Sequence, residues 1–540
     1  MLRTPFVYLA QINSIACDLK GNAIQILQAA REAKQAGAAL CLTPALSLSG
    51  WPLKSWLGQP DFLKALEKAR QDLAEALAKE APGVTVVVGA PAVESGKRFN
   101  AIYAFKDGSC LLRHDKKVLV EDEAGIFDGA NQCSVIELEG VRLGIAFADD
   151  LQQEDSWREF KRQGVQIVCA SDSSVYLRGI SEKRREHLRQ ACAHEAMPLV
   201  AVNRAGAIDD RIYEGSSFTA DGLGRLTTSL AAFKADAAVV EGGCLLGTSA
   251  PEIKPTRSEF ETLFDALVCA VRDYAGKNGF SDALLGLSGG ADSALVAAIA
   301  VEALGREHVH AVMMPTRYTS DLSLRLARTC AENLGIDYRI RPIGAIYDAA
   351  ASLLAEDFAG TKTGIAEENL QARSRGVTLM ALSNKFGWLT LATGNKSEGS
   401  TGYCTLYGDT VGGYAPIKDV FKTDVWELMR TYNRMKGREV IPQEIITRPP
   451  SAELKEGQTD EAALMPYERL DTILRALLES AEGMEELTQK GIAREEVRRV
   501  LQLLYRSEYK RRQCPVGPKI SCSRLSTEVA FPLTSFPSFL

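Results

Sequence analysis

The chain has 540 residues, and at roughly 100 to 200 residues per domain this length favours two or more domains. Apolar residues make up 46% of the chain, charged residues 24% and aromatic residues 7%, which is typical of a globular protein and excludes a disordered or collagen-like one. The formal net charge is −6, so we expect no overall positive field that would attract nucleic acid or anionic lipid.

The chain also lacks the features of a secreted or membrane protein. No apolar run approaches the roughly 18 residues that span a bilayer, and the first ten residues lack the long apolar core of a secretion signal. This predicts a cytoplasmic protein without a membrane partner. The 12 cysteines form no C-x-x-C or Cys/His cluster, which in a reducing compartment indicates free, mostly buried thiols and neither disulfides nor structural zinc.

Strands and helices alternate over residues 1–246, as apolar runs and helical spacings follow each other along the chain. The run at 84–93 is apolar throughout, as in strands that are buried on both faces. This alternation predicts one α/β layer domain. The expected strands are 6–11, 38–42, 84–93, 140–147, 165–169 and 198–203, and the expected helices are 22–37, 63–79 and 182–195.

A composition change marks the start of a second domain. Residues 247–256 (GTSAPEIKPT) contain two prolines and no apolar periodicity, and we expect a linker over 247–257. Ser258 and Glu261 then form a capping box, and apolar residues recur at helical spacing from 260 to 271. Strands at 283–287 and 309–315 with a helix at 293–304 between them predict a right-handed βαβ unit, within a domain that covers 258–540.

The first strand of this domain runs into a glycine-rich loop at the start of a helix. Its glycines allow consecutive backbone amides to turn toward one point, and the helix N-terminus adds partial positive charge, so the loop suits a phosphate group. No lysine follows the glycines; Asp292 instead offers a carboxylate for Mg²⁺. The alternative is an ordinary turn capped by Asp292 or Ser293. The loop comprises Leu287, Ser288, Gly289, Gly290, Ala291, Asp292 and Ser293.

The S-G-G-x-D-S pattern resembles the pyrophosphate-loop family of ATP pyrophosphatases, which bind ATP for adenylation. By itself it leaves asparagine, guanylate, argininosuccinate and transfer-RNA-modifying enzymes open. Further blocks follow in order and cover nearly all of 258–520: MPTRYTS at 314–320, EENLQAR at 367–373 before an expected helix, TGNKSE at 393–398 after the strand WLTLA, and the segments 406–425 and 449–461. Together they resemble the NAD synthetase family.

This resemblance implies a ligase that condenses deamido-NAD with ammonia, using ATP as co-substrate and releasing AMP and pyrophosphate. Asp292 and Glu398 would be Mg²⁺ ligands, Lys422 would neutralise charge at the attacked phosphate, and Ser451 would lie near the phosphates. Without the motifs, a solvated helix lysine and a charged rim are the alternatives. Matched positions imply contacts with deamido-NAD for Asn369, Arg375, Glu398, Asp409 and Lys519, and with ATP for Thr393 besides the loop residues 287–293.

The basic stretch 498–521 contains interleaved tyrosines, which could suggest nucleic acid. Its apolar residues recur at helical spacing, so an amphipathic helix packed on a core is the better interpretation. These residues are Val500, Leu501, Leu503 and Leu504.

Residues 1–246 resemble the nitrilase-type amidase that precedes the synthetase part in bacterial glutamine-dependent NAD synthetases. The segments AQINSIACDLKGN, LTPALSLSGWP, GIAFADDL and AVNRAGAIDDRIYEGSSF bear the similarity. The resemblance implies an αββα sandwich, followed by a doubly wound parallel-sheet domain like that of the adenine-nucleotide α-hydrolases. Amide hydrolysis in that family requires a thiolate nucleophile, a carboxylate base and an oxyanion-stabilising lysine.

The matching positions depart from this requirement. Ala45 stands where the family has the base, Ala148 where it has the nucleophile, and Ile180 where a glutamine-contacting lysine belongs. A lysine is retained at Lys116, by its spacing to Leu119, with Lys117 as the alternative register. Replacement nucleophiles are the alternatives: Cys169 and Cys41, which as strand cysteines suit a buried apolar position, or Asp149 and Asp150.

The sequence therefore predicts a pseudo-amidase domain joined to an ammonia-using NAD synthetase. The alternatives are a glutamine-dependent enzyme with another nucleophile, a non-catalytic interaction protein and a pyrophosphate-loop enzyme that modifies transfer RNA. We also expect a homo-oligomer, in which the amidase domain retains a role in assembly, and allow for a separate protein that donates ammonia.

Overall fold

The computed structural model describes residues 6–120, 122–246, 257–523, 525 and 528–534. The chain divides into two compact units, Met1–Thr256 and Arg257–Leu540, which are described separately. The linker expected at 247–257 lies outside the described residues except for Arg257. No helix within the described ranges is long and apolar enough to cross a membrane.

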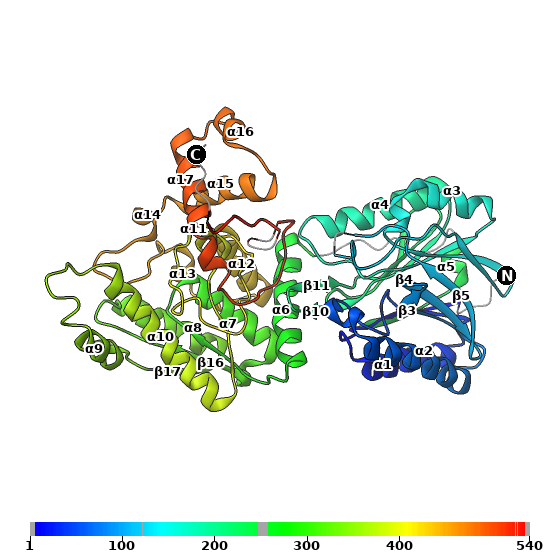
Figure 1. The fold of residues 1–540 in the computed structure, drawn as a ribbon, viewed down its shortest axis with the longest axis horizontal. Helices are drawn as coiled ribbons and strands as arrows, with labels where there is room; N and C mark the ends of the chain where they lie inside the picture. Colours follow the sequence, from blue (N-terminus) through cyan, green and yellow to red (C-terminus); the bar gives the residue numbers. More distant parts are fainter. Residues whose placement is uncertain (1–5, 121, 247–256, 524, 526–527, 535–540) are drawn as a thin grey trace. The chain divides into compact units, whose positions relative to one another are not determined.

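The first unit is a four-layer sandwich (Figure 1). One six-stranded sheet has the order β14-β1-β2-β3-β4-β5, the other has the order β13-β12-β9-β8-β7-β6, and β10 and β11 form a separate pair. The elements are β1 Val7–Gln11, α1 Leu19–Gln35, β2 Leu40–Leu42, α2 Pro60–Glu80, β3 Thr85–Glu94, β4 Lys97–Lys106, β5 Ser109–Asp115, β6 Ser134–Leu138, β7 Val141–Phe147, α3 Glu154–Arg162, β8 Ile167–Ser171, α4 Ile180–Glu195, β9 Leu199–Val202, β10 Ala205–Ile208, β11 Arg211–Glu214, β12 Phe218–Ala220, β13 Leu226–Ser229, β14 Asp236–Val240 and α5 Gly242–Leu246.

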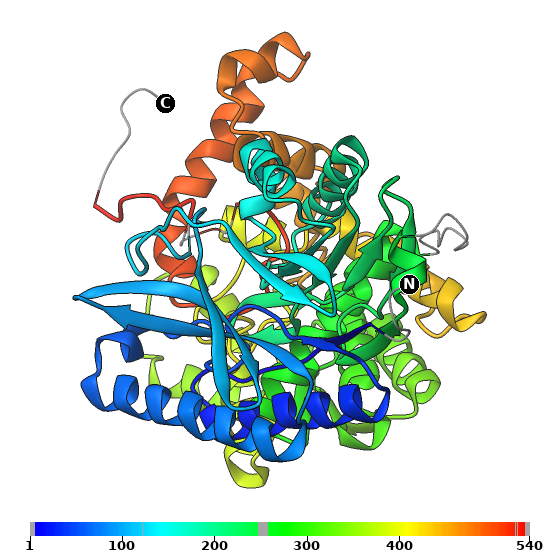
Figure 2. The same cartoon turned by 90° about the vertical axis from the view of Figure 1, so that its right-hand side faces the viewer.

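Three apolar clusters separate the four layers. One packs α1 and α2 on the first sheet, a second fills the space between the sheets, and a third packs α3 and α4 on the other sheet. Figure 2 shows α1 and α2, in blue, along one face of this unit. The first eight residues of β3 are buried, because helices cover one face of its sheet and the second sheet covers the other. The expected αββα sandwich is confirmed.

The second unit is built on a parallel sheet with the order β17-β16-β15-β18 and helices on its faces (Figure 1). Its first helix begins with the expected capping box of Ser258 and Glu261. The elements are α6 Glu259–Lys277, β15 Ala283–Gly286, α7 Ala291–Leu304, β16 Val309–Met313, α8 Asp321–Leu334, β17 Asp337–Ile340, α9 Gly344–Leu353, α10 Ile365–Phe386, β18 Leu389–Thr390, α11 Lys396–Thr401, α12 Lys422–Lys436, α13 Gln443–Thr447, α14 Asp460–Ala463, α15 Tyr467–Glu479, α16 Met484–Gln489, α17 Arg494–Arg506 and α18 Glu508–Arg511.

Several local expectations need correction. The block 367–373 does not precede a helix but lies within the first turns of α10, where Glu367 accepts a hydrogen bond from the backbone of Gly364. The expected strand at 388–392 is reduced to Leu389–Thr390, because only these residues pair with β15. The basic C-terminal stretch forms α17, in which Val500 and Leu504 are buried.

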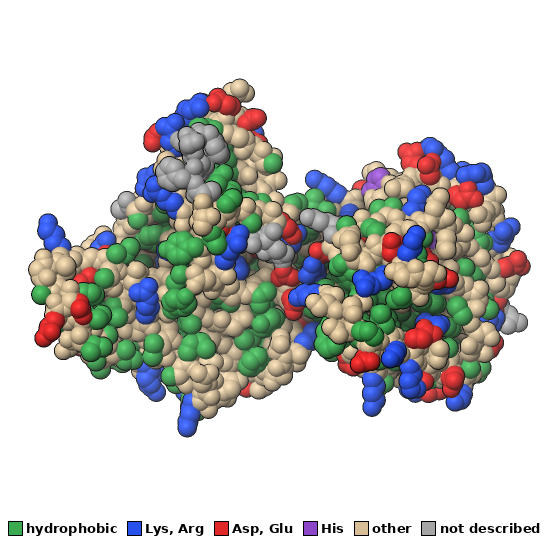
Figure 3. Space-filling model, viewed as in Figure 1, with side chains coloured by type: hydrophobic (Ala, Val, Ile, Leu, Met, Phe, Trp, Pro, Cys, Tyr) green, Lys and Arg blue, Asp and Glu red, His purple; other side chains and the backbone are tan. Residues whose placement is uncertain are grey.

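Charged side chains of both signs are interspersed on the visible face of each unit (Figure 3). Within that face there is no continuous basic stripe among the coloured residues, which gives no support to the transfer-RNA alternative.

Candidate active site

The glycine-rich loop connects β15 to α7, and its geometry depends on one glycine. Gly289 has φ +81°, and a Cβ at this position would lie 2.5 Å from the carbonyl oxygen of Ser323. The loop is closed by serines: Gly290 N–H donates to Ser288 Oγ at 3.2 Å, and Ser293 Oγ donates to the Gly290 carbonyl at 3.1 Å. The first turn of α7 is thereby fixed at the edge of a cavity.

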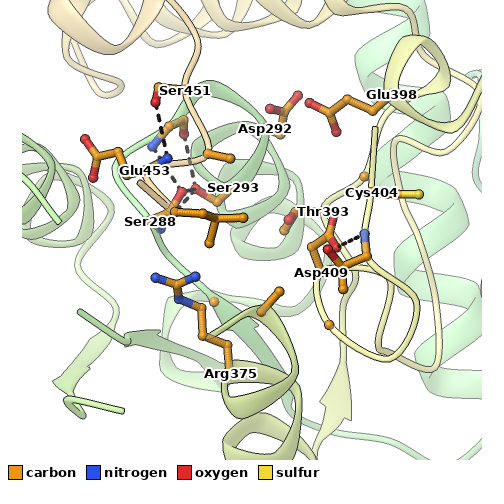
Figure 4. Close-up of a pocket in the computed structure, with 18 of the residues that line it drawn as sticks. Ser288, Asp292, Ser293, Arg375, Thr393, Glu398, Cys404, Asp409, Ser451 and Glu453 are labelled. Atoms are coloured by element: carbon orange, nitrogen blue, oxygen red, sulfur yellow. Dashed lines mark hydrogen bonds between the residues drawn. The ribbon is translucent and has the colours of Figure 1, made fainter. Parts of the chain in front are cut away.

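This cavity has a volume of about 410 Å³. Its walls come from the loop, β16, α10, the segments after β18 and before α12, and the segment 448–460 (Figure 4). Segments far apart in the sequence thus converge on one site. Of the residues predicted from sequence, the lining includes Leu287, Ser288, Gly290, Ala291, Asp292, Ser293, Asn369, Arg375, Thr393, Glu398, Asp409, Lys422 and Ser451.

A buried ion cluster lies at the helix end of the loop. Lys422 Nζ is 2.5 Å from Asp292 Oδ2 and 3.3 Å from Glu398 Oε1, and the two carboxylates lie next to each other in Figure 4. Asn395 donates to Asp292 Oδ1 at 2.8 Å and caps α11 by accepting from Glu398 N–H at 3.0 Å. Asn395 therefore holds both acids in position.

The cluster contains two carboxylates and one ammonium group, and this excess of negative charge shifts the pKa values of its members. Burial, together with the nearby Asp292 carboxylate, raises the pKa of Glu398 to about 8. Burial opposes the charged form of Lys422, but the Asp292 and Glu398 carboxylates outweigh it and raise the Lys422 pKa. Burial also raises the pKa of Asp460, which lines the same cavity.

The opposite wall of the cavity carries polar side chains from α10 and from the loop 405–409, which packs against that helix. Gly376 lets this loop approach, since a Cβ there would lie 2.5 Å from the Tyr407 carbonyl oxygen. Asp409 accepts from Thr405 N–H at 2.6 Å, and Thr405 Oγ1 donates to Asn369 at 2.8 Å. Arg375 donates through Nε to the Met314 carbonyl at 3.1 Å, which fixes the guanidinium at the cavity wall.

Ser451 organises the segment over the cavity. Its Oγ donates to the Gln458 carbonyl at 2.6 Å and accepts from Glu453 N–H at 3.2 Å. Arg448 donates to Ser323 Oγ at 3.0 Å and to Glu453 at 3.2 Å, which links the segment to α8 behind the phosphate loop.

Two of the predicted synthetase residues, Gly289 and Lys519, are not part of the cavity lining. The ammonium of Lys519 forms an ion pair with Glu528. The expected contact of Lys519 with the dinucleotide stays a prediction, and it would require the ion pair with Glu528 to open.

Asp292 and Glu398 form a donor set that fits Mg²⁺ bound together with a nucleotide. Among the described residues no group of three or more His, Cys, Asp and Glu side chains could hold a metal ion. Mg²⁺ commonly uses one or two carboxylates and completes its shell with water and substrate phosphates. The carboxylates of Asp292 and Glu398, which line the same cavity as the glycine-rich loop 288–293, meet this requirement.

In the first unit, the positions expected for amidase chemistry lie at the carboxyl ends of strands. Ala45 N–H donates to the Asp172 carbonyl and Ala148 N–H to the Ser171 carbonyl, each at 3.2 Å. Both alanines are buried. Their methyl groups can neither attack an amide nor accept a proton.

Lys116, not Lys117, is the buried lysine of this region. Its ammonium is 2.6 Å from Asp149 and 2.7 Å from Glu123. Burial opposes its charge, but these two carboxylates outweigh the effect and raise the Lys116 pKa. Ile180 is the first residue of α4 and is half-buried.

The strand cysteines lie in the apolar clusters. Cys169 is fully buried among the residues between the two sheets, and burial raises its pKa to about 12. Cys41 is fully buried in the cluster beneath α1 and α2, and burial raises its pKa. At neutral pH both are thiols, which are poor nucleophiles.

The comparisons with known proteins agree with this architecture. Residues 7–241 match the carbon-nitrogen hydrolase family, and residues 263–514 match the NAD synthase family. The fold and the site thus define a two-domain ligase with a nitrilase-like unit and an NAD synthase unit.

The relatives span the whole chain. The glutamine-dependent NAD(+) synthetase of Thermotoga maritima is 37% identical over 98% of both chains, and that of Synechocystis sp. is 39% identical over 95% of this chain and 96% of its own. The structure of glutamine-dependent NAD+ synthetase from Acinetobacter baumannii in complex with ADP has a TM-score of 0.78 at 36% identity, over 98% of both chains. The chain belongs to the glutamine-dependent NAD synthetase family and is an NAD synthetase.

Sequence reasoning did not identify several residues of the cavity. Asn395 and Arg448 stand within or beside the quoted blocks, yet amides and arginines at a turn give no signal of their partners. Asp460 was part of a quoted block without a role. Lys510 lines the cavity and donates to the carbonyls of Gly402 and Cys404, each at 2.7 Å.

A pH-dependent stability difference follows from Glu398. Its folded pKa of about 8 exceeds the ordinary value of 4.5, so the folded state binds more protons and its stability falls as pH rises from about 4.5 to about 8. Glu398→Gln should remove this dependence. In thermal unfolding without nucleotide or divalent cation, the melting temperature of the variant relative to the wild type should increase from pH 5 to pH 8. Glu468→Gln, on the exposed face of α15, is the control; a pH-independent difference for Glu398→Gln would contradict the assignment.

Proposed function

We propose that this NAD synthetase amidates deamido-NAD with free ammonia: deamido-NAD, ATP and NH₃ give NAD, AMP and pyrophosphate. Ala45 and Ala148 at the positions of the amidase base and nucleophile are the observation that carries the proposal. The ion pairs of Lys116 with Asp149 and Glu123 support it further, because they engage the ammonium that would otherwise stabilise an oxyanion.

The names of the relatives favour the alternative nitrogen donor, glutamine. That alternative requires a nucleophile other than Ala148 in this chain. The buried thiols are poor substitutes, since Cys169 lies between the sheets with its pKa raised to about 12 and Cys41 lies beneath helices. Carboxylates such as Asp149 are weak nucleophiles toward amides, and Asp149 is engaged by Lys116.

In the proposed first step, an oxygen of the nicotinate carboxylate attacks the α-phosphorus of ATP, and the bond to the β-phosphate oxygen breaks. The loop 288–293 would cradle the phosphates with its amides and the N-terminus of α7. The ADP complex of the Acinetobacter baumannii relative supports a nucleotide in this unit. Thr393, in the cavity wall after β18, would contact the same nucleotide.

Charge neutralisation is the main contribution of the cluster to this step. Lys422 is positioned by Asp292 and Glu398 to face negative charge that develops at the α-phosphate. Mg²⁺, held by Asp292 and Glu398, would supply Lewis-acid charge beside the phosphates. Ser451 would keep the segment 449–461 over them through its bonds to Gln458 and Glu453.

In the second step, ammonia attacks the acyl carbon, the C–O bond to AMP breaks and its electron pair leaves with the phosphate. Deamido-NAD must therefore extend from the phosphate loop along the opposite wall. Asn369, Arg375 and Asp409 would bind it there, since all three line the cavity and are held by neighbouring backbone or side-chain groups.

The N-terminal unit retains three well-packed apolar clusters although two catalytic positions hold alanine. We assign it a role in assembly, either against the synthetase unit or against a second subunit, in a homo-oligomer.

The nucleotide product tests the adenylation step. Attack at the α-phosphorus gives AMP and pyrophosphate, whereas ADP and orthophosphate would contradict it. Asp292→Ala should lower turnover by about 10²-fold or more, because it removes a partner of Lys422 and a carboxylate of the phosphate site. The measurement is chromatography of the nucleotides, with Asp357→Asn on the exposed surface as the control.

The nitrogen donor tests the pseudo-amidase. Ammonium should support NAD formation, faster as pH rises and more NH₃ is present, whereas glutamine should support only the rate of its ammonia contamination. Ala148→Cys with Ala45→Glu should restore little glutaminase, since Asp149 and Glu123 still engage Lys116. Stoichiometric release of glutamate coupled to NAD by the unmodified chain would overturn the assignment; Cys169→Ser would then be the next variant to examine.

Truncation tests the role in assembly. Residues 250–540 alone should have a lower melting temperature or a different mass by light scattering than the full chain. An isolated synthetase unit with unchanged assembly, melting temperature and ammonia-dependent rate would rule this role out.

A further inference from the structure

The carboxylate of Asp460 has no role in the chemistry described so far, although it lines the cavity. Asp460 is only 4% exposed. Its Oδ2 accepts from the Tyr467 hydroxyl at 3.2 Å, and the Tyr403 hydroxyl also lies beside the carboxylate. Its Oδ1 is buried and meets no donor in hydrogen-bond geometry among the described residues. A buried carboxylate oxygen without a partner costs free energy comparable to a lost hydrogen bond, and a bound group would offset this cost.

The surroundings of Asp460 favour a cation. Lys422 interacts electrostatically with Asp292, Glu398 and Asp460. Its single positive charge does not balance three carboxylates. Lys422 is already directly paired with Asp292 and Glu398, and the structure shows no such ion pair to Asp460. Negative charge at Asp460 is therefore only partly compensated.

Two features favour a compact monovalent cation over a second metal ion. Among the described residues no three acidic, His or Cys side chains are close enough to share a metal, so Asp460 does not complete a metal site with Asp292 and Glu398, although their charges repel. Aromatic rings also lie close by: Trp426 and Tyr403 line the cavity, and the Tyr467 ring contacts Trp426 edge-on at 6.1 Å. A carboxylate beside aromatic rings is a setting that binds ammonium-type groups.

The Tyr467 ring already faces one ammonium. Lys422 Nζ lies 5.3 Å from its centroid, while the hydroxyl of the same tyrosine donates to Asp460. One buried side chain thus connects the lysine at the phosphate site with the carboxylate of the segment 448–460. A cation bound by Asp460 would lie in the same cavity as the activated acyl group.

We infer that Asp460 binds the ammonium ion that supplies the amide nitrogen, through its free Oδ1. This inference rests on the proposed function, in which ammonia reaches the synthetase cavity in solution. Ammonium is the dominant form of ammonia at neutral pH, so a site that concentrates it beside the adenylate lowers the ammonium concentration needed for amidation. One proton passes to solvent water before nitrogen attacks the acyl carbon. A second proton passes to water as the amide forms, while the electron pair of the broken C–O bond leaves with AMP.

The test separates ammonium use from adenylation. Asp460→Asn is nearly isosteric and should raise the KM for ammonium by at least about tenfold. Pyrophosphate release from ATP and deamido-NAD without ammonium, and its dependence on Mg²⁺, should change by less than about twofold. An unchanged KM for ammonium would overturn the inference, as would slower adenylation with a higher Mg²⁺ requirement, which would make Asp460 a metal-binding residue. Asp357→Asn is the matched control on the surface.

A second measurement uses the unmodified protein and does not depend on the folding of a variant. Rubidium, whose radius is close to that of ammonium, should compete with ammonium in amidation and leave pyrophosphate release unaffected. Lithium chloride at the same ionic strength is the control, and equal effects of the two salts would overturn the inference.

Failure of the proposed function would be visible separately. If the wild type made NAD from glutamine but not from ammonium, the donor assignment would be wrong. Asp460→Asn should then still release glutamate at the wild-type rate while forming less NAD per glutamate. An unchanged ratio would overturn the role of Asp460 alone.

Discussion

Lys422 is buried in the wall of the synthetase cavity with its ammonium against two carboxylates, and the rest of the site is arranged around this contact. A lone ammonium in this position would be strongly penalised by desolvation, and removing one partner of a buried pair costs on the order of 3–5 kcal/mol. Asp292 comes from the phosphate loop and Glu398 from α11. The ion pair therefore brings the ends of β15 and β18 and the start of α12 to one point.

A buried lysine is also paired with two carboxylates in the N-terminal unit. Lys116 is buried with its ammonium 2.6 Å from Asp149 and 2.7 Å from Glu123, and carboxylates are weak nucleophiles toward amides. In the synthetase cavity, the carboxylates that pair with Lys422 also face the space where phosphates would bind. In the first unit, Asp149 and Glu123 compensate the charge of the buried lysine, beside the two buried alanines Ala45 and Ala148. Both buried lysines are thus held by a pair of carboxylates.

Packing and chemistry depend on different atoms of the nitrilase-like unit. Ala45 and Ala148 are small, buried side chains just after strand ends. The apolar cluster between the sheets requires volume and burial but no particular reactive group. The sandwich is therefore stabilised by its apolar clusters, whichever side chains occupy these two positions.

The sequence by itself determined the class of both units, the phosphate loop and most of the charged residues proposed for the site. It could do so because glycine-rich turns and helix caps act over a few residues. The capping box of Ser258 and the loop at 288–293 are examples of such local signals. Only the tertiary structure decided which groups pair. It showed that Lys116 is the buried lysine of its pair, that Lys519 pairs with Glu528, and that Asn395 contacts both Asp292 and Glu398. Partners of charged side chains can lie more than 100 residues apart, as Lys422 and Asp292 do with a separation of 130 residues. Their choice depends on burial and distance, which no local pattern records.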